Sequence, residues 1–260
     1  MKIAVCVKEV PDAGASRRHD PAADHRLVRD GDPALNPFDA HAIEAALQHA
    51  EGADGVTVTA VCMGPASAQR SVQKALALGA DDAVLISDDA LAGSDVLGTA
   101  RVLAAAIERG GYDLVLMGQQ SADGECWVLP GVVAALLGWP VLTQAASLSI
   151  EDGSVRIDRQ AEAGYEKVGA SLPAIVSVSD AINEPRYPSL KAIMGAKRKP
   201  LEQLDLAALD LPAGSVGQDG ARSIVRSVGD PPPQPGGTVI EDDGSAADRI
   251  VEFLRERNLV

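Results

Sequence analysis

Asp-Leu-Val-Leu-Met at residues 113–117 is followed by Gly-Gln-Gln-Ser-Ala-Asp-Gly-Glu-Cys-Trp at 118–127 and by the apolar stretch Val128–Leu137. The short apolar run predicts a buried strand, the small and polar residues predict a loop, and the longer apolar stretch predicts a helix. The same order recurs through the first half of the chain. We expect further strands at 3–7, 56–61 and 83–86, and helices at 36–50, after Gly64-Pro65 as far as Gly79, and at 96–107.

Asn36 and Pro37 suit the N-cap and first turn of their helix, and Gly79 suits a C-cap. Strands that alternate strictly with helices predict a parallel sheet with right-handed crossovers and helices on both faces. The predicted fold class is therefore α/β, with a doubly wound, mostly parallel, Rossmann-like sheet.

After Pro140 the pattern changes. A hairpin is predicted from Leu148–Ile150 and Val155–Asp158 with the turn Glu151-Asp152-Gly153-Ser154, and 174–178 predict a further buried strand. Beyond Pro200 periodicity is weak, Pro231–Gly237 is incompatible with regular structure, and an amphipathic helix carries Ile250, Val251, Phe253 and Leu254. We expect an α/β domain at 1–200 and a C-terminal arm at 201–260 that wraps a partner.

The composition excludes several classes of protein. The 260 residues carry a net charge of -14, which disfavours a general nucleic-acid binder because phosphate binding needs a basic face. No apolar run approaches the ~20 residues of a membrane span, and Met1-Lys2 leads directly into a strand, so we expect a cytoplasmic protein without membrane insertion. Cys6, Cys62 and Cys126 lack the spacing of a zinc site, and we expect Cys6 and Cys62 to be core thiols.

Motifs of common enzymes are absent from the sequence. It holds no GxxxxGK[ST], GxGxxG, GxSxG or HExxH pattern. The histidines His19, His25, His41 and His49 stand in polar contexts, which favours solvated or capping roles over metal or proton chemistry. We therefore predict no catalytic residue and no metal.

Three loops nevertheless follow predicted strands at the edge of the sheet where α/β proteins bind ligands. They are Cys6–Lys8, Met63–Pro65 and Gly118–Trp127. The last passes directly into a helix, whose first-turn N–H groups favour a phosphate. Because loops between strands and helices are generally rich in small polar residues, this chemistry alone leaves nucleotide binding open.

A second candidate site is the tract Asn183–Lys199. It combines prolines and basic residues with the apolar Tyr187, Leu190, Ile193 and Met194, inside an otherwise acidic protein. A small apolar surface ringed by charges is typical of a docking surface.

The order and spacing of several motifs make the chain resemble the β-subunit of electron-transfer flavoprotein over nearly its whole length. The motifs are Val7-Lys8-Glu9-Val10-Pro11-Asp12, Asn36-Pro37-Phe38-Asp39 with Ala42–Ala46, Gly64-Pro65-Ala66, Ala75–Asp81, Asp113–Gly118, Leu137-Gly138-Trp139-Pro140, Leu172–Val178 and the tract through Lys199.

The resemblance implies a heterodimer with an α-subunit that holds most of an FAD near the subunit interface, while the β-subunit binds a structural AMP. Electrons would come from flavin dehydrogenases and pass toward a membrane quinone oxidoreductase. By matching motif, the AMP contacts would be Cys6, Asn36, Pro37, Phe38, Asp39, Met63, Gly118, Gln119, Gln120, Ser121, Asp123, Gly124, Glu125, Cys126, Trp127, Val128 and Leu129. The residues that dock dehydrogenases would be Arg186, Tyr187, Leu190, Ile193, Met194, Lys197 and Lys199, with Leu190 as the apolar anchor.

One departure from the family leaves a second cofactor possible. Where an Asn-Gln-Thr-Gly-like turn is expected, this chain has Trp127-Val128-Leu129-Pro130, and Val128-Leu129-Pro130 fits a bifurcating branch in which a second FAD replaces AMP. Gly124-Glu125-Cys126 lacks the Gly-Asp-Thr-like segment of that branch, so AMP is favoured. Two further functions stay open at this point. One is an adenine-nucleotide sensor of the universal-stress type, and the other, with no base or metal set in its favour, is a nucleotide-hydrolysing or ligating enzyme.

Overall fold

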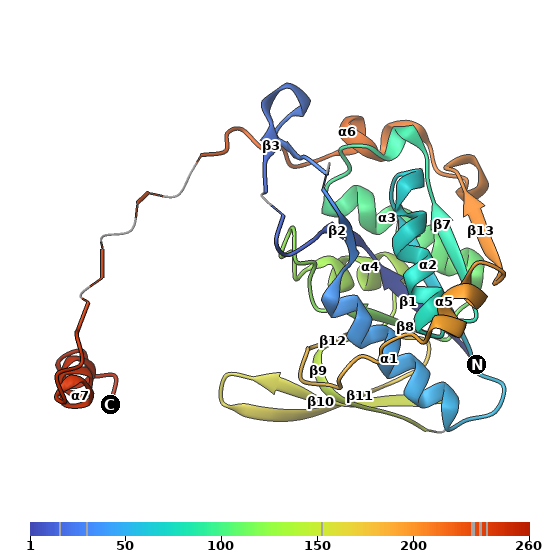
Figure 1. Cartoon of the computed structure of the whole chain (residues 1–260). Coiled ribbons are helices and arrows are strands. Elements are labelled where there is room, and N and C mark those ends of the chain that lie inside the picture. The colour runs from blue at the N-terminus through green and yellow to red at the C-terminus, as the bar shows by residue number, and fades with distance from the viewer. Residues whose placement is uncertain (16, 30, 152, 230–231, 234–235, 238) are drawn as a thin grey trace. The chain divides into compact units, whose positions relative to one another are not determined.

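The structure, a computed structural model, describes residues 1–15, 17–29, 31–151, 153–229, 232–233, 236–237 and 239–260. The chain divides into two compact units, Met1–Arg226 and Ser227–Val260. The first unit contains a nine-stranded sheet in the order β11-β10-β9-β12-β8-β1-β6-β7-β13 (Figure 1). The strands of this sheet are β1 (Lys2–Val7), β6 (Thr57–Met63), β7 (Asp82–Ile86), β8 (Leu114–Gly118), β9 (Val141–Glu151), β10 (Ser154–Ala161), β11 (Gly164–Ser171), β12 (Ala174–Val178) and β13 (Leu201–Leu204).

Pairing in the sheet is parallel from β9 through β12, β8, β1, β6 and β7 to β13, whereas β10 runs antiparallel to both β9 and β11. Two small antiparallel pairs lie outside it. They join β2 (Glu9–Pro11) to β5 (Pro33–Leu35), and β3 (His19–Asp20) to β4 (Arg26–Leu27). The predicted doubly wound α/β class is confirmed.

Helices cover both faces of the sheet. The helices of the first unit are α1 (Pro37–Glu51), α2 (Gln69–Leu78), α3 (Val96–Gly110), α4 (Leu129–Leu137), α5 (Leu190–Ala196) and α6 (Gly217–Gly220), and the second unit contains α7 (Ala246–Glu256). The 3-10 helices are η1 (Pro21–Ala23), η2 (Ala66–Ala68), η3 (Asp89–Leu91), η4 (Ala207–Leu209) and η5 (Ala213–Ser215). One hydrophobic core lies between the sheet and α1, α2 and α5, and the other lies between the sheet and α3 and α4.

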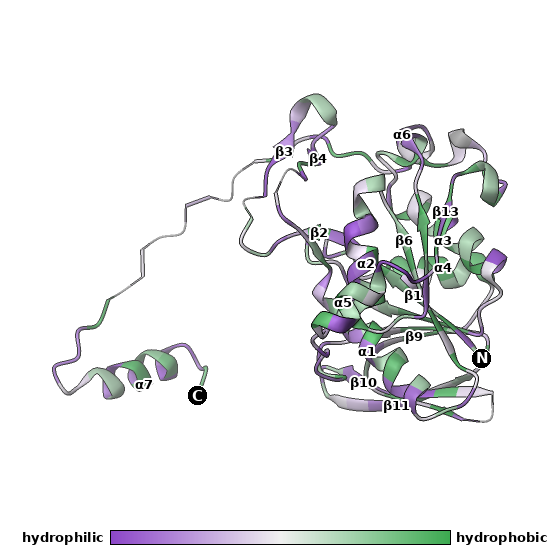
Figure 2. Ribbon diagram, turned by 45° about the vertical axis from the view of Figure 1, so that its right-hand side comes forward, coloured by the Kyte–Doolittle hydropathy of each residue, from purple (hydrophilic) through white to green (hydrophobic). Residues whose placement is uncertain are grey.

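The central strands are apolar along their length because both of their faces are covered (Figure 2). In β1, for example, Ile3 and Val5 face the first core while Ala4 and Cys6 face the second. Cys6 and Cys62 are buried free thiols, as predicted.

The structure extends the predicted elements after residue 140. The hairpin residues lie in β9 and β10 as expected, apart from Asp152 of the turn, which lies outside the described residues. However, β11 adds a third strand that the sequence pattern did not indicate. Its Gly-Tyr-Glu-Lys-Val-Gly-Ala-Ser sequence has too few apolar residues to signal a strand.

The domain boundary differs from the predicted one. Leu201–Leu204 form the edge strand β13 by pairing with β7, and the compact unit continues to Arg226. A four-residue strand with two polar residues gives little periodic signal, so 201–226 resembled an arm. In the second unit, the predicted amphipathic helix is α7, with Ile250, Val251 and Phe253 exposed. The described residues of Pro231–Gly237 form neither helix nor strand, while Pro231, Gln234 and Pro235 lie outside the described part.

Candidate functional site

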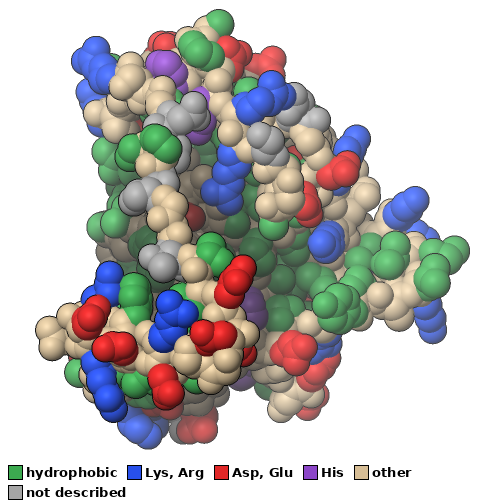
Figure 3. Space-filling model, turned by 60° about the vertical axis from the view of Figure 1, so that its left-hand side comes forward, with side chains coloured by type: hydrophobic (Ala, Val, Ile, Leu, Met, Phe, Trp, Pro, Cys, Tyr) green, Lys and Arg blue, Asp and Glu red, His purple; other side chains and the backbone are tan. Residues whose placement is uncertain are grey.

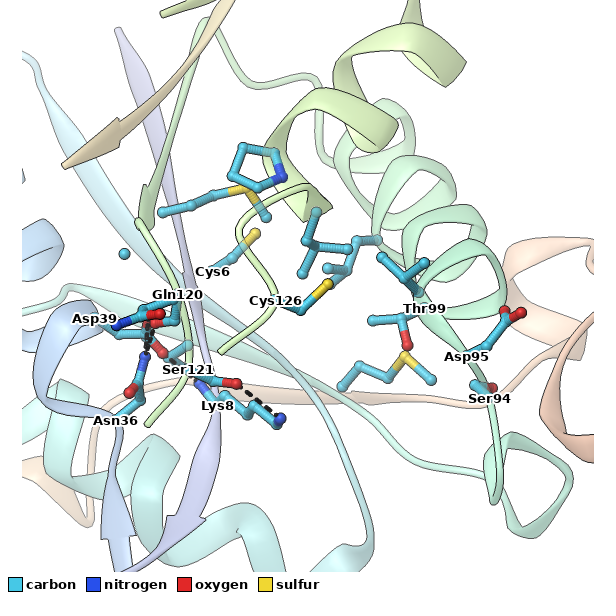
Figure 4. Close-up of a pocket in the computed structure, with 18 of the residues that line it drawn as sticks. Cys6, Lys8, Asn36, Asp39, Ser94, Asp95, Thr99, Gln120, Ser121 and Cys126 are labelled. Carbon is cyan, nitrogen blue, oxygen red and sulfur yellow. Dashed lines mark hydrogen bonds between the residues drawn. The ribbon is translucent and has the colours of Figure 1, made fainter. Parts of the chain in front are cut away.

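A cavity of about 370 Å³ lies at the carboxyl ends of the central strands (Figure 4). The chain passes from β1 to β6 and β7 on one side and then returns to place β8 on the other side of β1. The cavity therefore lies at the point where the strand order reverses, which is the usual ligand position in open α/β sheets. Its volume falls within the roughly 300–1,000 Å³ of small-molecule sites.

One wall is the start of α1. Asp39 is buried there, and its carboxylate accepts hydrogen bonds from the backbone N–H of Lys8 at 2.8 Å and from Asn36 Nδ2 at 2.8 Å. Burial raises the pKa of Asp39 to about 7, although these hydrogen bonds act to lower it. The carboxyl group therefore changes its ionisation near neutral pH.

Asn36 joins this wall to the loop after β8. Its Nδ2 donates to the Gln120 carbonyl at 2.9 Å, and its Oδ1 accepts from the Ala122 N–H at 3.1 Å. The residue occupies the N-cap position of α1 as predicted, but its side chain forms no capping hydrogen bond because it is engaged with the loop. Asn36 thus fixes the loop relative to the start of α1.

The rim of the cavity carries a charged cluster. Lys8 Nζ lies 2.8 Å from Asp123 Oδ1 and 3.1 Å from Ser121 Oγ, and Arg29 contacts the other oxygen of Asp123 at 2.6 Å. Burial raises the pKa of Asp123, but the charge and hydrogen bonds of Lys8 and Arg29 outweigh it and lower the pKa to about 2. The Lys8 side chain, which is 42 % exposed, brings a positive charge to the rim.

The opposite wall comes from the start of α3, which was not among the predicted site loops. Ser94, Asp95 and Thr99 line the cavity there. Asp95 caps the helix by accepting from the Gly98 N–H, and its other oxygen accepts from the backbone of Arg222 and Ser223. The available signal was that the strand at 83–86 ends at the same sheet edge as the other site strands, with an N-cap residue type at Asp95 before the next helix.

Two polar groups define what the cavity can bind. Among the described residues, Gln120 Oε1 is a buried acceptor without a hydrogen-bond partner, which costs about 1–3 kcal/mol unless a ligand supplies a donor. Burial raises the pKa of Cys6, so its thiol is protonated and unsuited to nucleophilic chemistry. The described part of the chain contains no group of three His, Cys, Asp or Glu side chains placed to hold a metal ion.

The structure brings together about half of the predicted nucleotide contacts. Those that line the cavity are Cys6, Asn36, Asp39, Met63, Gly118, Gln120, Ser121, Cys126 and Leu129. The others, Pro37, Phe38, Gln119, Asp123, Gly124, Glu125, Trp127 and Val128, are absent from its lining. Trp127 and Val128 are 46 % and 57 % exposed, since α4 begins only at Leu129.

The predicted docking residues lie on and beside α5. Tyr187, Leu190, Ile193 and Met194 are exposed, with Leu190 at 79 %. Hydrophobic and basic side chains project together at the right-hand edge of Figure 3. Lys197 is exposed, but Lys199 Nζ donates to the carbonyls of Leu76, Gly79 and Ala80 at the end of α2. The ammonium group of Lys199 thus points into the fold.

The chain is similar in sequence to known proteins over most of its length. A family model described as the electron transfer flavoprotein domain matches residues 24–209. The chain is 36% identical over 272 residues to an electron transfer flavoprotein subunit beta of Megasphaera elsdenii, with 100% of both chains covered. It is 37% identical over 264 residues to the subunit of that name from Mycobacterium tuberculosis, with 99% of each covered.

A further relative is the caffeyl-CoA reductase-Etf complex subunit CarD of Acetobacterium woodii, which is 34% identical over 264 residues with both chains fully covered. None of the helices in the described ranges combines the length and apolarity needed to cross a membrane. The family match spans most of the chain, and the relatives match it from end to end. This chain therefore belongs to the β-subunits of electron transfer flavoprotein.

Proposed function

We propose that the chain pairs with an α-subunit and that the heterodimer accepts electrons from flavin dehydrogenases and delivers them to a membrane quinone oxidoreductase. The FAD that carries the electrons is held mainly by the α-subunit, and the cavity of this chain binds AMP. When bound, the flavin supplies the redox chemistry, while the protein supplies position and electrostatics. The second unit, Ser227–Val260, wraps the α-subunit through the apolar side of α7.

The observation that carries the nucleotide assignment is Gln120, which lines the cavity and whose buried Oε1 is, among the described residues, an acceptor without a hydrogen-bond partner. An adenine base carries an exocyclic amine and a ribose carries hydroxyl groups, and either supplies the missing donor. Lys8 at the rim and the first-turn N–H groups of α4, whose N-cap residue Val128 supplies no side-chain hydrogen bond, favour the phosphate. These groups bind and orient a nucleotide. With a protonated Cys6 and no metal-binding group among the described residues, they offer no catalytic set.

AMP fits the cavity better than a second FAD. A volume of about 370 Å³ lies at the lower end of the range for ligand sites, and FAD is AMP joined to a whole FMN. The second FAD of a bifurcating subunit is therefore the competing assignment that the experiment must test.

The docking role of the tract at 183–199 rests on its exposure and charge. Leu190 presents an apolar side chain to solvent at the first position of α5, and Lys197 and Arg198, just beyond the last residue of that helix, are exposed as well. One apolar anchor with flanking charges gives fast, weak association, which suits a carrier that must release each partner quickly.

The test is to purify the chain with its native partner, denature the complex and identify the released nucleotides by chromatography and absorbance. We expect one FAD and one AMP for each pair of subunits. Two FAD would replace this proposal with bifurcation. An unpartnered chain that releases only ATP, or nothing, would overturn it in favour of a sensor.

A variant tests the cavity itself. Gln120→Leu removes the unpartnered acceptor, so AMP should be lost or bound more weakly while FAD remains. Ser67→Ala, at an exposed position outside the cavity lining, is the control and should keep both nucleotides. Retention of a full equivalent of AMP by Gln120→Leu would contradict the role given to Gln120.

A further inference from the structure

The exposed segment Tyr187–Arg198, called here the docking segment, is fastened at both ends to the helices of one sheet face. Its only regular element is α5, a helix of 7 residues. Helices of this length are not stable in isolation. Ser189 caps α5 by accepting from the Ala192 N–H, but the position of the segment depends on how its ends are held.

Arg186 makes the first set of contacts that hold the docking segment in place. Its Nε lies 2.6 Å from Glu44 Oε2 and its Nη1 lies 2.5 Å from Glu51 Oε1, while Nη2 donates to both carboxylates. The backbone N–H of Arg186 also donates to Glu44. Glu44 and Glu51 lie two turns apart on α1, so the guanidinium group of Arg186 bridges two carboxylates in the second half of that helix.

The burial of Glu44 makes this contact more than a surface ion pair. The Glu44 side chain is 7 % exposed, whereas that of Glu51 is 63 % exposed. Burial raises the pKa of Glu44, but hydrogen bonds from Arg186 and Gln48 outweigh it, so the pKa lies below its ordinary value. A buried carboxylate that loses its paired cation is strongly unfavourable, whereas exposed pairs contribute little.

Two further contacts hold the ends. Asn183 exchanges hydrogen bonds with His41, with Asn183 Nδ2 donating to the His41 carbonyl at 3.0 Å and the His41 ring nitrogen Nδ1 lying 2.9 Å from the Asn183 carbonyl. His41 is thus a structural link, rather than the solvated or capping residue expected from the sequence. At the other end, Lys199 Nζ contacts three carbonyls at the end of α2.

We propose that Arg186 is a positioning residue for dehydrogenase docking. It fixes the start of the docking segment to α1, and Lys199 fixes the end to α2, so that Leu190 meets the partner in one preset position. A segment that is already ordered loses less conformational entropy on association. This inference rests on the proposed docking function, and it replaces the direct contacts that the sequence predicted for Arg186 and Lys199.

The experiment uses the heterodimer and a flavin dehydrogenase that reduces the wild-type protein. Arg186→Lys keeps the charge but loses the forked geometry, and Glu44→Gln removes the buried carboxylate. Both variants should raise KM for the dehydrogenase about tenfold, with kcat and nucleotide content unchanged. Arg109→Lys is the matched control because Arg109 pairs with Glu202 at 2.7 Å between exposed side chains on α3 and β13, and its KM should stay at the wild-type value.

Two readouts separate positioning from direct contact. Amide hydrogen exchange in the docking segment should speed up in Arg186→Lys and Glu44→Gln even without a dehydrogenase. Combined with Leu190→Ala, Arg186→Lys should raise KM little beyond the effect of Leu190→Ala alone, because positioning Leu190 no longer matters. Glu51→Gln, at the exposed end of the contact, should give a smaller rise and serves if the other variants fail to fold.

The outcomes are distinguishable. Additive effects of Arg186→Lys and Leu190→Ala, or an Arg186→Lys effect that Glu44→Gln does not reproduce, would mean that Arg186 touches the dehydrogenase itself, and the inference would be wrong. A normal KM for Arg186→Lys beside a raised KM for Leu190→Ala would also overturn it. A normal KM for Leu190→Ala would instead refute the docking assignment on which the inference rests.

Discussion

Gly118→Ala should damage the cavity by pushing α1 away from β8. Gly118 ends β8 directly against the first turn of α1. A Cβ atom at this position would lie 2.6 Å from Asp39 Oδ1 and 2.7 Å from both the carbonyl carbon and the Cβ of Phe38. The two Phe38 atoms are a backbone carbon and the Cβ of the same residue. Neither belongs to the flexible end of a side chain, so the backbone itself must move.

The required movement follows from these distances. Carbon atoms pack at about 3.5 Å or more, so a contact at 2.7 Å demands a shift of about 0.8 Å. The same shift would stretch the 2.8 Å hydrogen bond from the Lys8 N–H to Asp39 toward about 3.6 Å, beyond the range of a hydrogen bond. Overpacking of this kind costs about 1–3 kcal/mol, and the midpoint of thermal unfolding should fall by roughly 2–4 °C for each kcal/mol.

Thermal unfolding and the nucleotide content of the purified heterodimer measure the two effects. We expect a lower midpoint and substoichiometric AMP for Gly118→Ala. Gly214→Ala is the control because a Cβ there meets nothing within 4 Å and the residue is absent from the cavity lining, so stability and AMP content should stay at the wild-type values. Wild-type stability with a full equivalent of AMP in Gly118→Ala would refute the close approach of α1 and β8.

Three further predictions concern charged groups. Because burial raises the pKa of Asp39 from its ordinary 3.8 to about 7, the native state holds the proton more tightly, and the free energy of unfolding should fall by up to roughly 4 kcal/mol between about pH 4 and pH 7. Urea titrations should show this slope in the wild type and not in Asp39→Asn, and equal slopes would contradict it. Asp123 acts oppositely: despite burial, Lys8 and Arg29 hold its pKa at about 2, so its stabilisation, roughly 2 kcal/mol, is present above about pH 4 and lost toward pH 2. Acid unfolding of Asp123→Asn should lack that loss, and an unchanged acid limb would count against the ion pairs. Lys199→Met leaves three carbonyls of α2 and its C-cap without their donor and should lower the free energy of unfolding by about 1–3 kcal/mol, which an unaltered urea midpoint would disprove.

The parallel part of the fold was predictable because each strand carries its own signal. Strands buried on both faces, such as Ile3–Val7 and Leu114–Met117, show uninterrupted apolar runs, and the helices between the strands have clear ends at Pro37 and Gly79. The edge strands β11 and β13 were missed because an edge strand buries less and keeps polar residues. These two segments form strands because they pair with β10 and β7, and their own sequences give little indication of it.

Site residues were predictable only where the course of the backbone fixes their position. Loops after the apolar strands identify Cys6, Met63 and Gly118, because the end of a parallel strand fixes their place. The direction of side chains was not predictable. Asn36 turns from helix capping to the loop, and Lys199 turns inward to α2. Ser94 and Thr99 enter around the start of α3, where the sheet edge of the preceding strand and the N-cap residue type at Asp95 were the available signal.

Helix α1 joins the two proposed sites. Its first turn carries Asn36 and Asp39 in the wall of the cavity, and Glu44 and Glu51 along the same helix hold Arg186 at the start of the docking segment. A ligand that binds only the folded state stabilises that state by RT ln(1 + [L]/Kd). The stabilisation acts through the residues that the ligand contacts. AMP held at the first turn would thus stabilise the helix on which the docking segment is fastened. On the two proposals made above, a nucleotide with no part in the redox chemistry would help keep rigid the surface that the dehydrogenases recognise.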